Sequence, residues 1–298
     1  MKKRLIFTAI AYFLINANAY ADLNIVVSYP YIGDITKKVG GDNVSVTVFG
    51  KGDWDMHFVV PRPSFIAKTR NADLLIMNGA QLEIGWLPPL LNQANNPELM
   101  PGKSGILDLS NFVKLIDIPG NISRSMGDVH PAGNPHYQLD PGNIPLISAA
   151  IAKKLAMLDP EHAGQYQKNN AEFSAKWKVK LAEWDGKMSV LKGSRVIQYH
   201  KLCNYFLKRY NLMEAGTIEP LPGIPPSSRH LENLIAMVKR EGNVKFILQD
   251  VYHPDEASRF LRDKTGVNFI VFPHDVNAVN EASDIFSLFE SIVRRLTQ

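Results

Sequence analysis

Cysteine is almost absent from this 298-residue chain, because Cys203 is the only one. A single cysteine allows no internal disulfide, and none lies near the N-terminus where a lipid could be attached. After the first 21 residues, no apolar run reaches the roughly 18 residues that a membrane-spanning helix needs. An excess of charge is also missing, since 45% of the residues are hydrophobic and 21% are charged. This composition excludes disordered, collagen-like and coiled-coil chains.

The N-terminal segment has the features of an export signal. Lys2-Lys3-Arg4 precedes an apolar run at residues 5–15, which is too short to span a bilayer, and Ala19-Tyr20-Ala21 is a small-x-small cleavage site. We therefore predict a signal peptide at residues 1–21 and a periplasmic protein without a lipid anchor. Its removal takes away three positive charges and no negative one, which lowers the net charge from +4 to +1. We expect no nucleic-acid partner.

Short β-rich runs alternate with helical patterns in both halves of the chain. Expected strands lie at residues 24–27, 44–49, 73–78, 194–199, 245–248 and 269–272, and expected helices at 202–210, 231–241, 255–265 and 283–296. This alternation is typical of α/β proteins, in which helices cross over between parallel strands. We expect two lobes, each with a parallel sheet flanked by helices.

A long helical segment separates the two halves. Its large apolar residues recur in steps of three and four, the period of a helix stripe: Phe173, Trp177, Leu181, Trp184, Met188 and Leu191. We predict an N-terminal lobe at residues 22–143, a connecting helical segment at 144–192 and a C-terminal lobe at 193–298. One long backbone helix would join two separate lobe cores, and we expect a monomer.

Four of the local settings around the eight histidines are typical of ligand sites. His57 lies in a polar and aromatic stretch after an expected strand, and His136 lies in a loop with flanking prolines. His200 directly follows an expected strand, and the pair His274-Asp275 follows another after Pro273. Open α/β sheets present their ligand groups at such strand ends. Two settings fall in each half, which predicts one shared site in the cleft between the lobes.

Three neutral imidazoles and one carboxylate suit zinc in a closed four-coordinate site, whereas magnesium and calcium prefer oxygen ligands. For single residues a structural role stays open: a surface, loop or buried histidine at 57, 136 and 200, and a helix or turn cap at Asp275. At His130 an exposed loop histidine is favoured over an accessory ligand. The remaining histidines are interpreted as structural or solvent-facing: His162, His230 and His253.

The mature chain resembles the metal-binding solute receptors of ABC importers, which capture zinc or manganese and deliver it to a membrane permease. The resemblance rests on several motifs together: Asp55-Met56-His57 with Pro63-Ser64 and Ala72-Asp73-Leu74, Asn134-Pro135-His136 with Leu139-Asp140-Pro141, Tyr199-His200, and Ile218-Glu219-Pro220. It implies a stiff backbone helix and the metal ligands His57, His136, His200 and Asp275, with Asp275 preferred over His274.

Three departures from the family pattern concern the site. Met56 replaces the usual proline before the first ligand, and Gln249-Asp250 stands where many members have Glu-Pro. The His-rich insertion that often precedes the second ligand is missing. A histidine at position 200 implies zinc over manganese, because manganese members tend to carry glutamate there. Manganese or another divalent transition metal stays an alternative.

Two other functions are compatible with parts of the pattern. A zinc hydrolase would use His57, His136 and His200 as ligands with Asp55 as base, and it would need an open coordination position. An adhesin-like interaction protein would share the fold and act through surface patches. The chain has no His-Glu-x-x-His helix, no Gly-x-Ser-x-Gly elbow and no phosphate-binding glycine loop. We therefore expect a carrier and not an enzyme.

Overall fold

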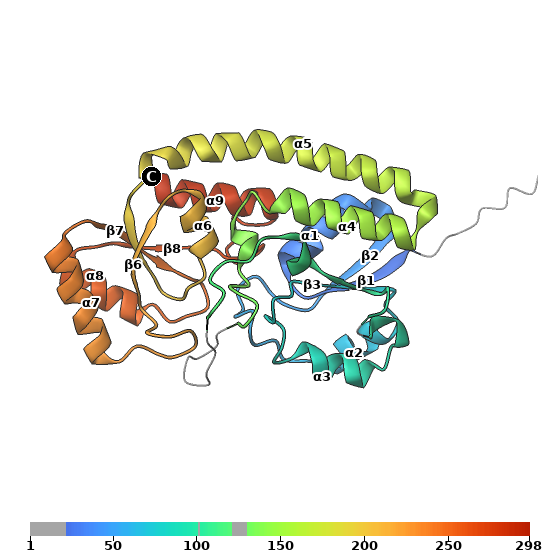
Figure 1. Cartoon of the computed structure of the whole chain (residues 1–298), viewed down its shortest axis with the longest axis horizontal. Helices are drawn as coiled ribbons and strands as arrows, with labels where there is room; N and C mark the ends of the chain where they lie inside the picture. Colours follow the sequence, from blue (N-terminus) through green and yellow to red (C-terminus); the bar gives the residue numbers. More distant parts are fainter. Residues whose placement is uncertain (1–21, 101, 121–129) are drawn as a thin grey trace, which may run out of the picture.

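The computed structural model describes residues 22–100, 102–120 and 130–298 (Figure 1). The predicted signal peptide at residues 1–21 lies outside these residues. Within the described parts of the chain, no helix is both long enough and apolar enough to cross a membrane.

Two four-stranded parallel sheets form the centres of the two lobes. The N-terminal sheet has the order β2-β1-β3-β4, with β1 at Leu23–Val27, β2 at Val44–Val48, β3 at Leu74–Met77 and β4 at Ile106–Asp108. The C-terminal sheet has the order β6-β5-β7-β8, with β5 at Arg195–Gln198, β6 at Met213–Thr217, β7 at Val244–Gln249 and β8 at Phe269–Val271. The apolar central strands are buried on both faces, as is usual for parallel sheets.

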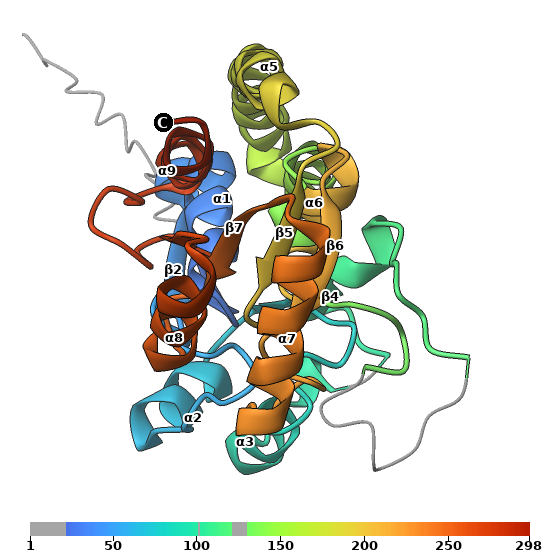
Figure 2. The same ribbon diagram turned by 90° about the vertical axis from the view of Figure 1, so that its left-hand side faces the viewer.

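Helices surround both sheets. They are α1 at Pro30–Gly40, α2 at Pro63–Arg70, α3 at Leu87–Ala94, α4 at Ile144–Leu158, α5 at Ala163–Met188, α6 at Asn204–Arg209, α7 at Ser228–Glu241, α8 at Glu256–Thr265 and α9 at Ile285–Thr297. A proline in the first turn of each of α1 to α4 fixes where these helices begin. Figure 2 shows α7 and α8 in front of the C-terminal sheet, covering its outer face. These elements confirm the two-lobe α/β fold.

The expected backbone helix is α5, which runs along both lobes (Figure 1). Trp177, Trp184 and Met188 are completely buried, so the apolar stripe predicted from the sequence is confirmed. The two indole rings pack on each other at 5.1 Å and against Phe289 of α9 at 5.5 and 5.4 Å between ring centroids. These contacts attach the backbone helix to the C-terminal helix.

The main core does not stop at the boundary between the lobes. One buried apolar cluster includes Ile25 of β1, Ile151 of α4 and Trp177 of α5, and continues to Val196 of β5 and Phe289 of α9. A second, smaller cluster lies under α7 and α8 and includes Ile197, Leu234 and Leu261. The expectation of two separate lobe cores is therefore wrong, because the helices between the sheets contribute to both lobes.

Strands β4 and β6 were not expected from the sequence. Both lie at an edge of their sheet. β4 has three residues, and β6 contains Glu214 and Gly216, which are poor β-formers. Pairing with a central strand therefore stabilises them more than their own composition does.

Candidate metal centre

Three histidines that are far apart in the sequence meet between the two lobes. One ring nitrogen each of His57, His136 and His200 lies within 4.8 Å of the other two. Their ring centroids are 5.5 to 5.6 Å apart. His57 comes from the loop between β2 and α2, His136 directly precedes a short 3-10 helix at Tyr137–Leu139, and His200 follows β5. The structure thus brings together three of the four predicted ligand residues.

Carboxylates orient two of these rings. Nδ1 of His57 lies 2.7 Å from Oδ1 of Asp55, and Nδ1 of His200 lies 2.7 Å from Oε2 of Glu219. An ionised carboxylate can only accept, so Nδ1 carries a hydrogen in both rings, and Nε2 is the ring nitrogen left to coordinate a metal. The two carboxylates therefore orient both rings to offer Nε2.

His136 is buried with both ring nitrogens unpartnered. It is 1% exposed, and neither Nδ1 nor Nε2 has a hydrogen-bond partner. A buried polar atom without a partner is costly, which makes such a nitrogen a candidate ligand atom. Burial, reinforced by the neighbouring His200 and His57, holds the pKa of His136 well below its usual range. The ring is therefore neutral, the form that coordinates metals.

The two carboxylates behind the histidines are ionised. Burial alone would raise the pKa of Glu219, but hydrogen bonds from His200 and His253 outweigh it and lower the pKa to about 2. Burial likewise opposes ionisation of Asp55, and the hydrogen bond from His57 reverses the effect and lowers its pKa. The site therefore has two fixed negative charges next to its imidazoles, which favours a bound cation.

A fourth histidine lies at the same place. Nε2 of His130 is 3.1 Å from Nε2 of His57, and the two rings stack at 5.2 Å between centroids. Burial and the nearby His57 lower the pKa of His130 to about 4. The sequence favoured an exposed loop histidine here, and this interpretation is wrong: the ring is half-buried and lies against the three-histidine cluster.

Asp275 is buried but is not part of the cluster of three. Its Oδ1 accepts from the backbone N–H of Tyr31, at the start of α1, at 2.8 Å and from that of Val276 at 2.6 Å. It therefore caps α1, the structural role that the sequence left open. Its Oδ2 is buried without a partner, and burial raises the pKa of this carboxyl well above its usual range. The neighbouring His274 uses Nε2 to contact the carbonyl of Trp54 at 3.1 Å.

The loop that carries His57 is held from both lobes. Met56 is 2% exposed, and its carbonyl accepts a hydrogen bond from the Tyr29 hydroxyl. A Cβ on Gly52 would lie 2.0 Å from the carbonyl oxygen of Val276, so the loop passes against the segment after β8 at a distance that only glycine allows. Met56, which stands in place of the family's proline, anchors the loop because its side chain is part of the buried core.

The groups behind His200 were not predicted as site residues, although Glu219 belongs to one of the sequence motifs. Glu219 contacts Nδ1 of His200 through one oxygen, and its Oε1 is 3.0 Å from Nε2 of His253. Nδ1 of His253 is in turn 2.9 Å from Oδ2 of Asp250. The available signal was the position of Glu219 at the carboxyl end of β6, beside β5, but β6 itself was not expected.

Comparisons with known proteins agree with this fold. The family model of zinc-uptake complex component A, periplasmic, matches residues 25–298. The manganese ABC transporter substrate-binding lipoprotein ScaA of Streptococcus gordonii is 29% identical over 198 residues, covering 65% of this chain and 61% of that protein. The iron ABC transporter substrate-binding lipoprotein MtsA of Streptococcus pyogenes serotype M1 is 27% identical over 235 residues, covering 72% and 73%.

A solved structure extends the likeness to nearly the whole chain. The crystal structure of ZnuA superposes with a TM-score of 0.76 at 24% identity, covering 92% of this chain and 99% of that one. Among the curated proteins the overlap is shorter, and the chain spans about three fifths of the length of the first relatives that it matches.

Proposed function

The chain belongs to the family of periplasmic A components of zinc-uptake complexes, and on this premise we propose that it is the metal-capturing protein of an ABC importer. It would bind one zinc ion in the periplasm and release it to the membrane permease of that importer. The observation that carries this proposal is the convergence of His57, His136 and His200 within 4.8 Å. The relatives are named substrate-binding proteins, and we propose a carrier without catalytic activity.

Zinc is the cargo that the donor set favours. Imidazole nitrogens suit zinc, whereas manganese binds well to carboxylate and carbonyl oxygens. The relatives are named for manganese and for iron, so these are the competing ions. At this site, the carboxylates of Asp55 and Glu219 are occupied by histidine Nδ1 atoms. The three imidazole nitrogens therefore make up most of the donor set.

The fourth donor is either Asp275 or His130. Asp275 matches the family's ligand position and has a free buried oxygen, but that carboxylate also caps α1. His130 has its Nε2 already 3.1 Å from Nε2 of His57. Asp275→Asn and His130→Ala separate the two: the variant that lacks the true fourth donor should lose more zinc affinity than the other.

His200→Ala tests the proposed function directly. Purified without added metal, the wild-type chain should carry one zinc ion, and competition against manganese and iron should leave zinc bound. Loss of one of the three imidazoles should abolish tight binding in calorimetric titration, because Nε2 of His200 is one of the metal-facing nitrogens. His230→Ala is the matched control, since the His230 ring contacts the carbonyl of Thr217 at 2.8 Å and is not in the cluster.

Two results would contradict the proposal. One is a wild-type chain that binds no zinc, manganese or iron at neutral pH. The other is a His200→Ala variant that binds as tightly as His230→Ala.

Export is proposed from the N-terminal residues. Cleavage after Ala21 would give a periplasmic protein that begins at Asp22. The intact mass of the protein recovered from the periplasm determines its N-terminal residue. The curated relatives are named lipoproteins, whereas the only cysteine here, Cys203, is buried at the start of α6. The same measurement therefore also shows whether a lipid is attached.

A further inference from the structure

Asn134 joins the backbone at His136 to the backbone beside His200. Its Oδ1 accepts a hydrogen bond from the backbone N–H of His136 at 2.9 Å, and its Nδ2 donates to the carbonyl of Lys201 at 2.8 Å. Lys201 directly follows His200, which belongs to the C-terminal lobe. One side chain therefore connects the backbones beside two metal-facing histidines across the gap between the lobes.

The backbone of Asn134 is held as firmly as its side chain. Its N–H donates to the carbonyl of Ile116 at 2.8 Å, and its carbonyl accepts from the hydroxyl of Tyr205 at 2.7 Å. The same hydroxyl accepts from the N–H of Ile116 at 3.1 Å. Since Tyr205 is in α6 of the C-terminal lobe, a second cross-lobe contact meets the same residue. Asn134 is 9% exposed, so these bonds are largely shielded from water.

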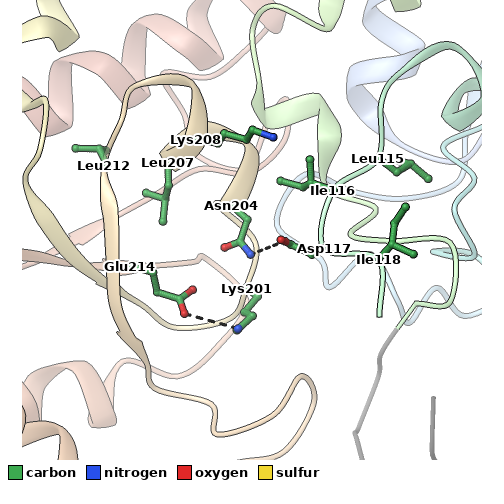
Figure 3. Close-up of a pocket in the computed structure, with 10 residues that line it drawn as sticks. All are labelled: Leu115, Ile116, Asp117, Ile118, Lys201, Asn204, Leu207, Lys208, Leu212 and Glu214. Atoms are coloured by element: carbon green, nitrogen blue, oxygen red, sulfur yellow. Dashed lines mark hydrogen bonds and ion pairs between the residues drawn. The ribbon is translucent and has the colours of Figure 1, made fainter. Parts of the chain in front are cut away.

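A second asparagine joins the lobes nearby without touching the histidines. Figure 3 shows Asn204 and Asp117 facing each other from the two sides of a groove of about 670 Å³. Nδ2 of Asn204 lies 2.6 Å from Oδ2 of Asp117, and Nδ2 of Asn134 lies 3.4 Å from the same oxygen. The two amides thus share an acidic neighbour, but only Asn134 binds the backbone beside His136 and His200.

We propose that Asn134 is a positioning residue that fixes the separation of His136 and His200 in the metal-free protein. The inference rests on the proposed metal-binding function. Its physical basis is that a carboxamide accepts and donates at the same time, as the two bonds at this position require. A carboxylate of the same size accepts from His136 but repels the carbonyl of Lys201. Residues that orient metal ligands typically change metal affinity by about 10- to 100-fold when substituted.

Asn134→Asp tests this role, with Asn204→Asp as the matched control. Both changes add one negative charge beside Asp117, so the control variant has the same net charge as Asn134→Asp. We expect Asn134→Asp to weaken zinc binding by about 10- to 100-fold, and Asn204→Asp to leave it little changed. With cobalt as probe, the visible absorption spectrum should change only for Asn134→Asp, because the donor geometry relaxes.

Hydrogen exchange of the metal-free proteins gives a readout that needs no cargo. Exchange in residues 113–118 and 201–206 should be faster in Asn134→Asp than in the wild type, because the hydrogen bond from Asn134 to the carbonyl of Lys201 is lost. Equal zinc affinity and an equal cobalt spectrum in Asn134→Asp and Asn204→Asp would overturn the inference. A wild-type chain that binds neither zinc nor cobalt would instead overturn the proposed function.

Tyr205→Phe keeps the inference testable if Asn134→Asp does not fold. This change removes only the hydroxyl that joins Asn134 and Ile116 to α6. We expect weaker zinc binding and faster exchange at residues 113–118 in a folded protein. If Tyr205→Phe binds zinc and exchanges its amide hydrogens as the wild type does, the contacts of Asn134 across the lobes do not fix the separation of His136 and His200.

Discussion

At the scale of single residues, charged side chains behind the clustered histidines hold those histidines in place. His253 bridges two carboxylates, with Nε2 3.0 Å from Glu219 and Nδ1 2.9 Å from Asp250. Burial alone would lower its pKa, but these two hydrogen bonds raise it from 6.5 to about 9. The ring is therefore charged at neutral pH and holds Glu219 in place against His200.

The raised pKa of His253 predicts a pH-dependent contribution to stability. A histidine whose folded-state pKa is raised stabilises the fold fully below its ordinary pKa, and this contribution is lost as the pH rises through about 9. We expect His253→Gln to lower the free energy of unfolding of the metal-free protein by about 2 kcal/mol near pH 6. Near pH 10 the difference from the wild type should be much smaller.

Urea denaturation at the two pH values measures this difference. His230→Gln is the control, because the His230 ring contacts the carbonyl of Thr217. A loss in His253→Gln that is independent of pH, or larger at the alkaline value, would show that the charge of His253 does not stabilise the fold.

Local sequence settings predicted the clustered histidines well. His57, His136 and His200 each lie in a loop or at a strand end, and these settings are visible in the sequence. The contact of His130 with His57 and that of His253 with Glu219 were not predictable, because each joins residues at least 34 positions apart. Asp275 stays a prediction, since the structure shows its cap on α1 and leaves its second oxygen free.

At the scale of elements, α5 depends on one aromatic face. Trp177 is completely buried, packs on Trp184 and Phe286, and donates its indole N–H to the carbonyl of Pro141 at 2.8 Å. Val179 is on the same helix but is 61% exposed. Substituting Trp177 therefore tests the packing of the helix, and substituting Val179 tests its intrinsic helix propensity.

Trp177→Ala should lower the free energy of unfolding by about 3–5 kcal/mol, because it leaves a cavity and an unpaired carbonyl at Pro141. Val179→Ala should change it by no more than about 0.5 kcal/mol. Urea denaturation measures both, and the comparison holds if the slope of the transition is unchanged. An equal loss in the two variants would mean that the aromatic face does not anchor the helix.

Periodicity predicted the long elements and missed two of the four edge strands, β4 and β6. The stripe of α5 extends over many turns, so its pattern is unambiguous. β4 has three residues, and β6 has a glycine and a glutamate, so neither sequence predicts a strand by itself. Both become strands because they pair with β3 and β5. The missed β6 is also the reason that Glu219 was not placed beside His200.

At the scale of the whole molecule, the lobes share one core through α4, α5 and α9. The sequence could not show this, because a helical stripe reveals which face is buried but not which partners cover it. A shared core favours a single cooperative unfolding reaction, since each lobe loses part of its buried surface when the other unfolds.

We therefore predict one unfolding transition for the metal-free protein. Tryptophan fluorescence reports on the N-terminal lobe and the backbone helix, where Trp54, Trp86, Trp177 and Trp184 lie. Circular dichroism in the far ultraviolet reports on all helices, including α7 and α8. The two urea curves should coincide, and two separated midpoints would contradict a shared core.

The position of α9 has a consequence for the order in which the chain can fold. This helix follows all the other described helices in the sequence, yet its first N–H, that of Ile285, donates to Asp34 of α1, and Asp284 forms an ion pair with Lys38 of α1 at 3.1 Å. The apolar face of α9 completes the cluster that begins at β1. Without α9, the apolar surfaces of α1 and α5 that it covers would stay exposed to water, so the N-terminal lobe cannot complete its core from its own residues alone.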